Sequence, residues 1–105
     1  MNTLNILGKT FRIEWLDELD GAVGETHTHK QLIKMQKGTA LETEQETLLH
    51  EVIHAVDESL ALGLTENQVH ALACGLYAVL KDNEQPVKKY YGTVRTPSRK
   101  ARSTR

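Results

Sequence analysis

Two amphipathic helical patterns in direct succession constrain the fold of this chain more than any other feature. Each pattern repeats apolar side chains at intervals of three and four residues, which is the spacing of a helix that buries one face. The first pattern consists of Leu49, Val52, Ile53, Val56 and Leu60, and the second of Val69, Leu72, Ala73, Leu76, Val79 and Leu80. Because Gly63 lies between them, the sequence predicts two consecutive helices with buried stripes.

Capping boxes mark the predicted start of both helices. Thr43 with Glu46 opens the first helix, and Thr65 with Gln68 opens the second. In such a box each side chain satisfies a backbone N–H group that the first turn of a helix leaves free. The first helix is predicted to end near Gly63, and the second is predicted to end around residues 82–83.

Short strands are predicted ahead of the helices. Residues 3–8 and 9–16 are strand-like, and Phe11 and Ile13 fit the two-residue period of a strand. Residues 26–36 offer a third strand or a hairpin. Strands followed by helices indicate an α+β domain. We expect a small N-terminal antiparallel sheet packed on the two helices.

Length and composition indicate one small soluble domain. The chain has 105 residues, and its single cysteine, Cys74, excludes an intrachain disulfide. The N-terminal residues lack the basic and apolar segments of a signal peptide, and no run approaches the roughly 18 apolar residues that span a bilayer. We expect a cytoplasmic protein with no membrane partner.

Charge divides the chain into two parts. Residues 87–105 carry seven Lys and Arg side chains and no acid, whereas residues 1–86 carry six basic and fourteen acidic groups. We expect a folded domain over residues 1–86 and a basic tail over residues 87–105 that is extended or disordered. The tail could contact nucleic acid weakly, with Tyr90 and Tyr91 stacking on bases. A solubilising role and contact with an acidic partner are the alternatives.

The segment ETLLHEVIHAVDESL, residues 46–60, carries the candidate chemistry. His50 and His54 are four residues apart and share one face of the predicted helix, where both can bind one metal ion. Glu51 is rotated from His50 by about 100°, and it can reach a metal-bound water without binding the metal. Zinc lowers the pKa of such a water to about 7, and a neighbouring carboxylate can then act as general base in peptide hydrolysis.

A third metal ligand is expected from the second helix, because a catalytic zinc site uses three protein ligands. His70 and Glu66 are the two candidates. Asp57 could accept a hydrogen bond from an imidazole of the site, or it could be a solvated helix acid. Cys74 is interpreted as a buried thiol and Tyr77 as a residue at the edge of the core, ahead of roles in metal binding and oxyanion stabilisation.

Residues 47–83 resemble a family of small phage and prophage zinc metallopeptidases, which are compact relatives of the ImmA/IrrE-type and SprT-like gluzincins. The resemblance rests on His-Glu-x-x-His at residues 50–54 and on the helix that follows. In ImmA/IrrE-type proteins a Glu-x-x-Ala-Asn signature on that helix supplies the third ligand. Its positions fall here on His70, Ala73 and Cys74, so that His replaces the ligand Glu. His is also a zinc ligand.

The resemblance implies a fold, an activity and a partner. We expect a minimal zincin-like domain that acts as a zinc-dependent metallopeptidase on a protein or peptide substrate in a bacterial host cell. His50, His54 and His70 would bind Zn²⁺, and Glu51 would be the general base. By analogy with zincin-type peptidases, residues 25–36 would form the sheet edge that binds the substrate backbone. The alternative is a phage-encoded protein that binds zinc without catalysis and serves in protein interaction or nucleic-acid association.

Overall fold

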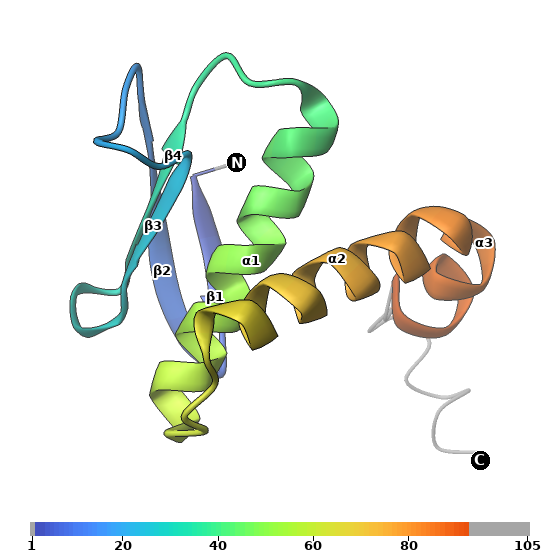
Figure 1. Ribbon diagram of the computed structural model, residues 1–105. Coiled ribbons are helices and arrows are strands. Elements are labelled where there is room, and N and C mark those ends of the chain that lie inside the picture. The colour runs from blue at the N-terminus through green and yellow to red at the C-terminus, as the bar shows by residue number, and fades with distance from the viewer. Residues whose placement is uncertain (1, 93–105) are drawn as a thin grey trace.

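The protein folds as a four-stranded sheet followed by helices (Figure 1), in a computed structural model that describes residues 2–92. The sheet consists of β1 (Thr3–Ile6), β2 (Lys9–Leu16), β3 (Gly24–His27) and β4 (Leu32–Gln36), with a short 3₁₀ turn, η1 (Thr28–Lys30), between the last two strands. The helices are α1 (Leu41–Leu60), α2 (Glu66–Asp82), α3 (Glu84–Val87) and η2 (Lys88–Gly92). The prediction of an α+β fold is confirmed, and residues 26–36 belong to a hairpin.

The sheet is mixed, which corrects the expectation of an antiparallel sheet. Its strand order is β1-β2-β4-β3, and β1 pairs with β2 in the antiparallel sense. The strand β4 lies between β2 and β3 and is antiparallel to β3. On its other side, β4 runs parallel to β2, with Ile33 opposite Ile13. The strand β3 is left at one edge of the sheet.

The main core lies between the sheet and α1. Alternation along β2 points Phe11 and Ile13 to one face, where both are buried. Ile33 and Met35 of β4 join them, and Ala55 of α1 is fully buried against the sheet. A side chain as small as that of alanine lets the helix lie close to the strands. The helix α1 contacts β1, β3 and β4, so it covers one face of the sheet.

The two predicted capping boxes have different outcomes. The helix α1 begins at Leu41 with Ala40 as its N-cap, and no side chain caps it. The predicted box of Thr43 with Glu46 is therefore wrong, because the N-cap lies three residues earlier, at Ala40, and Thr43 lies inside the first turn. The box at the start of α2 is confirmed, since Gln68 N donates to Thr65 Oγ1 (3.1 Å) and Thr65 N donates to Gln68 Oε1 (2.8 Å).

A tight turn connects α1 to α2. Ala61 ends α1 in the left-handed conformation, with φ at 53°, and Gly63 has a φ of 74°. Asp57 closes the turn, because its Oδ1 accepts a hydrogen bond from Leu64 N at 3.0 Å. This fixes where α2 begins relative to the last two turns of α1.

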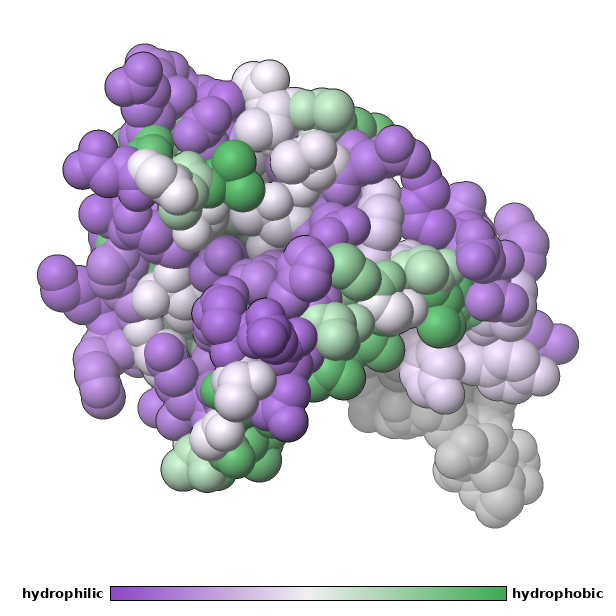
Figure 2. All heavy atoms as spheres, in the orientation of Figure 1, coloured by the Kyte–Doolittle hydropathy of each residue, from purple (hydrophilic) through white to green (hydrophobic). Residues whose placement is uncertain are grey.

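Only the first half of α2 carries buried residues. Within residues 2–92, α2 makes its tertiary contacts with α1 and α3 and does not pack on the sheet, which corrects the expectation of a sheet packed on both helices. Val69 and Ala73 are buried, whereas Leu72, Leu76, Val79 and Leu80 are exposed, against the prediction of a buried stripe. These residues are exposed because α2 runs away from the sheet beyond its first turns (Figure 1). Figure 2 shows the resulting hydrophobic patch along α2.

The segment after α2 is helical as far as Gly92, so the prediction of an extended chain after residue 86 is wrong for residues 87–92. Pro86 lies within the first turn of α3, where a residue without a backbone N–H is tolerated. The rest of the predicted tail, residues 93–105, lies outside the described residues. None of the helices within residues 2–92 combines the length and apolar content needed to cross a membrane.

Candidate metal centre

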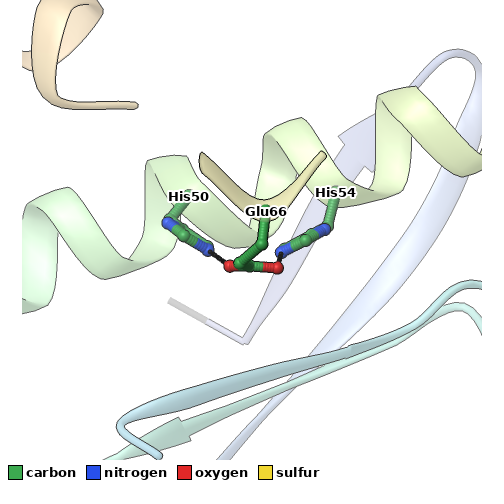
Figure 3. A group of neighbouring side chains, drawn as sticks. All are labelled: His50, His54 and Glu66. Carbon is green, nitrogen blue, oxygen red and sulfur yellow. Dashed lines mark hydrogen bonds and ion pairs between the residues drawn. The ribbon is translucent and has the colours of Figure 1, made fainter. Parts of the chain in front are cut away.

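Three side chains from two helices converge where α2 begins beside α1 (Figure 3). His50 and His54 lie one helical turn apart on α1, and Glu66 is the first residue of α2. Glu66 Oε1 lies 2.9 Å from His50 Nε2, and Glu66 Oε2 lies 3.2 Å from His54 Nε2. One carboxylate thus faces both imidazoles with a separate oxygen for each.

The local sequence explains this convergence. Spacing of four residues places both histidines on one face of α1, beside the stripe that packs on the core. The capping box of Thr65 with Gln68 fixes the first turn of α2, and Asp57 fixes the turn before it. Because Glu66 follows the N-cap directly, its position is set by both constraints.

The donor atoms of His50, His54 and Glu66 all lie within 4.8 Å of one another and could hold a metal ion. Two imidazole nitrogens and one carboxylate oxygen form a known ligand set of catalytic zinc. Ligand atoms about 2.1 Å from a tetrahedral zinc are separated by about 3.4 Å. The two histidine-to-glutamate distances run to different carboxylate oxygens, and the donor atoms of the group lie within 4.8 Å of one another. The donor types fit zinc, and closing the group on an ion requires the three side chains to move together.

The charge of Glu66 suits a metal ligand. Desolvation raises its pKa, but the hydrogen bond with His50 and the charge of His54 outweigh that effect, so the pKa lies below its ordinary value of 4.5. The carboxyl group is therefore ionised at neutral pH. Its side chain is 69% exposed, whereas those of His50 and His54 are about one-fifth exposed, at 20% and 22%. The site is thus open towards solvent on the side of α2.

Glu51 lies next to this donor group and is buried, with only 6% of its surface exposed. Its Oε1 accepts a hydrogen bond from Thr26 Oγ1 at 2.6 Å. Glu51 does not belong to the donor group, so its carboxylate could act as a proton acceptor in the pocket that it shares with that group.

A pocket of about 620 Å³ lies between β3, α1 and α2, and it is lined by Thr26, His50, Glu51, His54 and Glu66 among others. The wall from β3 includes Gly24, Glu25 and Thr26, and the wall from α1 includes Glu46 and Glu58 in addition to the site residues. A pocket of this size can accept several atoms of a peptide or another small ligand next to the donor group.

The residues that could hold a metal ion are His50, His54 and Glu66, whereas the sequence analysis favoured His70 as the third ligand, and Glu51 lines the same pocket. His70 lies one turn further along α2, with its ring centroid 6.2 Å from that of His50. It lines the pocket but lies outside the donor group. The short turn between Leu60 and Glu66 places the first turn of α2 beside the last turns of α1. The first residue of α2 therefore contacts both histidines. The confirmed capping box was the sequence signal for this position.

Cys74 and Tyr77 point to partners outside the donor group. Cys74 Sγ donates to Glu46 Oε2 at 3.3 Å and lies 3.5 Å from His70 Nε2. The hydrogen bond with Glu46, followed by burial, raises the pKa of the thiol above its ordinary value, so it stays protonated at neutral pH. Tyr77 donates its hydroxyl to Gln45 at 2.8 Å.

Asp57 does not accept a hydrogen bond from an imidazole of the site, the role considered from the sequence. Its carboxylate accepts one from Leu64 N instead. This interaction holds the turn between the helices. Asp57 therefore supports the site through the backbone and not through an imidazole.

Comparison of the chain with protein-family models, with curated proteins and with solved structures finds no match. The resemblance to small zinc metallopeptidases stays a prediction.

Proposed function

We propose that this protein is a zinc-dependent metallopeptidase in which His50, His54 and Glu66 bind the ion and Glu51 is the general base. The observation that carries the proposal is the position of Glu51. It is buried beside a group of three donors, it lines the same pocket, and it follows one of the ligands directly in the sequence.

The number of donors supports a catalytic site over a structural one. Structural zinc sites are closed by four protein ligands, whereas catalytic sites use three and keep one position for water or substrate. Within residues 2–92 only three side chains form the donor group. Cys74, the residue that could have closed the site, is bonded to Glu46 and keeps its proton.

The chemistry follows from these assignments. When bound, zinc lowers the pKa of a coordinated water to about 7 and polarises a substrate carbonyl. As general base, Glu51 would accept a proton from the attacking water and return it to the nitrogen of the leaving amine. His50, His54 and Glu66 would hold the ion.

The edge strand supports a peptide as the substrate. β3 pairs only with β4 in the sheet, and its residues line the pocket. An extended peptide can add to such an edge through main-chain hydrogen bonds. This would place its carbonyl groups along the pocket that holds the donor group.

The change of third ligand is compatible with the proposed family. In the ImmA/IrrE-type signature the third ligand is a Glu, and Glu66 is of that type. It lies one helical turn before His70, the position on which the signature falls.

The test is peptide hydrolysis by the zinc-loaded protein and by Glu51→Gln. We expect one zinc per chain in both proteins and a loss of about 10²- to 10⁴-fold in kcat/KM for the variant, which is the contribution of a general base. Hydroxamate should inhibit the wild type. Equal hydrolysis by both proteins would refute the role of Glu51. Bound zinc without any hydrolysis would favour the alternative, a protein that binds zinc without catalysis.

A further inference from the structure

We infer that Thr26 and Gly24 of the edge strand β3 position the carboxylate of Glu51 beside the metal centre. The inference rests on the proposed function, since it assigns two positioning residues to the proposed general base. It starts from the contacts around Glu51, which is the one charged side chain buried within residues 2–92.

Thr26 holds one oxygen of the carboxylate. Its Oγ1 lies 2.6 Å from Glu51 Oε1 and 3.0 Å from the main-chain oxygen of the same residue. A threonine hydroxyl has a single proton to donate, and the shorter contact to the charged group is the stronger one. The hydroxyl therefore ties the side chain of Glu51 to the strand and also lies against its backbone.

The lack of a side chain at Gly24 leaves room for the other carboxylate oxygen, Glu51 Oε2. A Cβ atom at this position would lie 3.0 Å from Glu51 Oε2, 3.0 Å from Glu51 Cγ and 2.7 Å from Thr47 Cγ2. Contacts this short force the neighbouring atoms to move, so any side chain here would displace Thr47 and Glu51 or separate β3 from α1. Gly24 is therefore required by the closeness of strand and helix.

The strand period brings the two residues to the same place. Residues two apart on a strand point to one face, and β3 places this face against α1, as the contacts of Thr26 and Gly24 show. Pairing of β3 with the central strand β4 holds the register, with Gly24 opposite Met35 and Thr26 opposite Ile33. The carboxylate is thus fixed by a rigid element and not by a loop.

The consequence is a base with one orientation. A general base must lie within hydrogen-bond reach of the proton that it takes, and a shift of about 1 Å can cost about 100-fold in rate. Thr26 holds Oε1, and Gly24 allows Oε2 to lie where a side chain would otherwise be. The same strand that we propose for substrate binding would then also set the position of the base.

The test compares Thr26→Val, which removes the hydroxyl but keeps the shape, with Thr26→Ser, which keeps the hydroxyl. Zinc stoichiometry should stay at one per chain in both. We expect kcat to fall about 10- to 100-fold in Thr26→Val, the loss expected for a hydrogen bond to a charged group. KM should change little. Thr26→Ser should recover most of the rate, and a purely structural role would not give this pattern.

A second readout does not depend on hydrolysis. Co²⁺ replaces zinc and gives a visible spectrum that reports the atoms around the ion, including the hydrogen bonding of a bound water. We expect the spectrum of Thr26→Val to move towards that of Glu51→Gln, and the spectrum of Thr26→Ser to match the wild type. Gly24→Ala is the second variant, measured in case Thr26→Val fails to fold, and it should change the spectrum in the same direction.

The outcomes separate the inference from the proposed function. If the wild type hydrolyses nothing but the Co²⁺ spectrum responds as expected, the positioning roles hold and the peptidase proposal fails. If the wild type hydrolyses peptides and neither Thr26→Val nor Gly24→Ala changes the rate or the spectrum, the positioning roles are refuted and the peptidase proposal stands.

Discussion

Glu66 Oε1 and His50 Nε2 lie 2.9 Å apart, although sixteen residues separate them in the sequence. This contact joins the first turn of α2 to the middle of α1. The three donors therefore come together only when the turn between the helices has formed. Metal binding is then linked to folding, because an ion that binds only the assembled site stabilises the folded state.

The first prediction is that zinc stabilises this protein through Glu66 and without His70. At a free zinc concentration of 100 times the dissociation constant, the wild type should gain about 2.7 kcal/mol in its free energy of unfolding. Glu66→Gln should lose most of this gain, because it removes the anionic ligand. His70→Ala is the matched control on the same helix and should keep the gain.

The measurement is thermal unfolding with added zinc and with chelator, followed by circular dichroism. A zinc effect that survives Glu66→Gln but disappears in His70→Ala would return the third ligand to His70. Equal melting temperatures with zinc and with chelator in the wild type would exclude a metal site of useful affinity.

The outcome for Glu66 and His70 shows how far sequence reasoning reaches. The spacing of His50 and His54 is local, since one helix fixes it, and it was predicted correctly. The third donor depends on the angle at which α2 leaves α1. That angle is set by the turn at residues 61–65 and by Asp57, which no periodicity in the sequence reports.

The second prediction concerns the thiol of Cys74. The hydrogen bond to Glu46, burial and the charge of Glu46 raise its pKa above 9.0, because the thiolate would lie beside a carboxylate. Glu46→Gln removes that charge and should bring the pKa back towards 9.0. Since the thiolate is the nucleophile, alkylation near pH 8 should be faster in Glu46→Gln than in the wild type.

Iodoacetamide labelling of the metal-free protein over a range of pH measures this difference. His70→Ala is the control, because it leaves the contact between Cys74 and Glu46 in place, and its labelling should stay slow. Faster labelling in His70→Ala than in Glu46→Gln would mean that the imidazole, and not the carboxylate, controls the thiol.

The third prediction is a pH dependence from the ion pair between α1 and α2, in which Lys81 Nζ lies 2.8 Å from Glu42 Oε2. The hydrogen bond with Lys81 and its charge lower the pKa of Glu42 below 4.5. The same contact raises the pKa of Lys81 above 10.5. The pair therefore stabilises the fold between those values. Its contribution is lost as pH falls through the lowered pKa of Glu42 or rises through the raised pKa of Lys81.

The variant Glu42→Gln should lower the melting temperature slightly at pH 7 and should have a smaller effect at pH 3. The change should be small and weaker at high salt, because both side chains are largely exposed. A difference between the two proteins that grows as the pH falls from 7 to 3 would contradict the assigned signs.

The burial of the two helices was predicted unequally well. Alternation along β2 predicts the burial of Phe11 and Ile13 correctly. Of the predicted stripe of α1, Ile53 is buried, Leu49, Val52 and Val56 are partly buried against the core, and Leu60 is exposed. The stripe of α2 has the same period, but only Val69 and Ala73 of it are buried. Periodicity shows that a helix has an apolar face, and it does not show how much of that face finds a partner in the same chain.

The last prediction compares the loss of stability caused by truncating a core residue with that caused by truncating an exposed residue of α2. Phe11 is 1% exposed in the main core, and Phe11→Ala should lower the free energy of unfolding by about 3–5 kcal/mol. Leu76 is 46% exposed on α2, and Leu76→Ala should change the free energy of unfolding by about 0.5 kcal/mol or less. Urea unfolding at several protein concentrations measures both values. A large, concentration-dependent loss in Leu76→Ala would show that another chain covers this face of α2 in solution, because exposed leucines contribute little to the stability of a monomer.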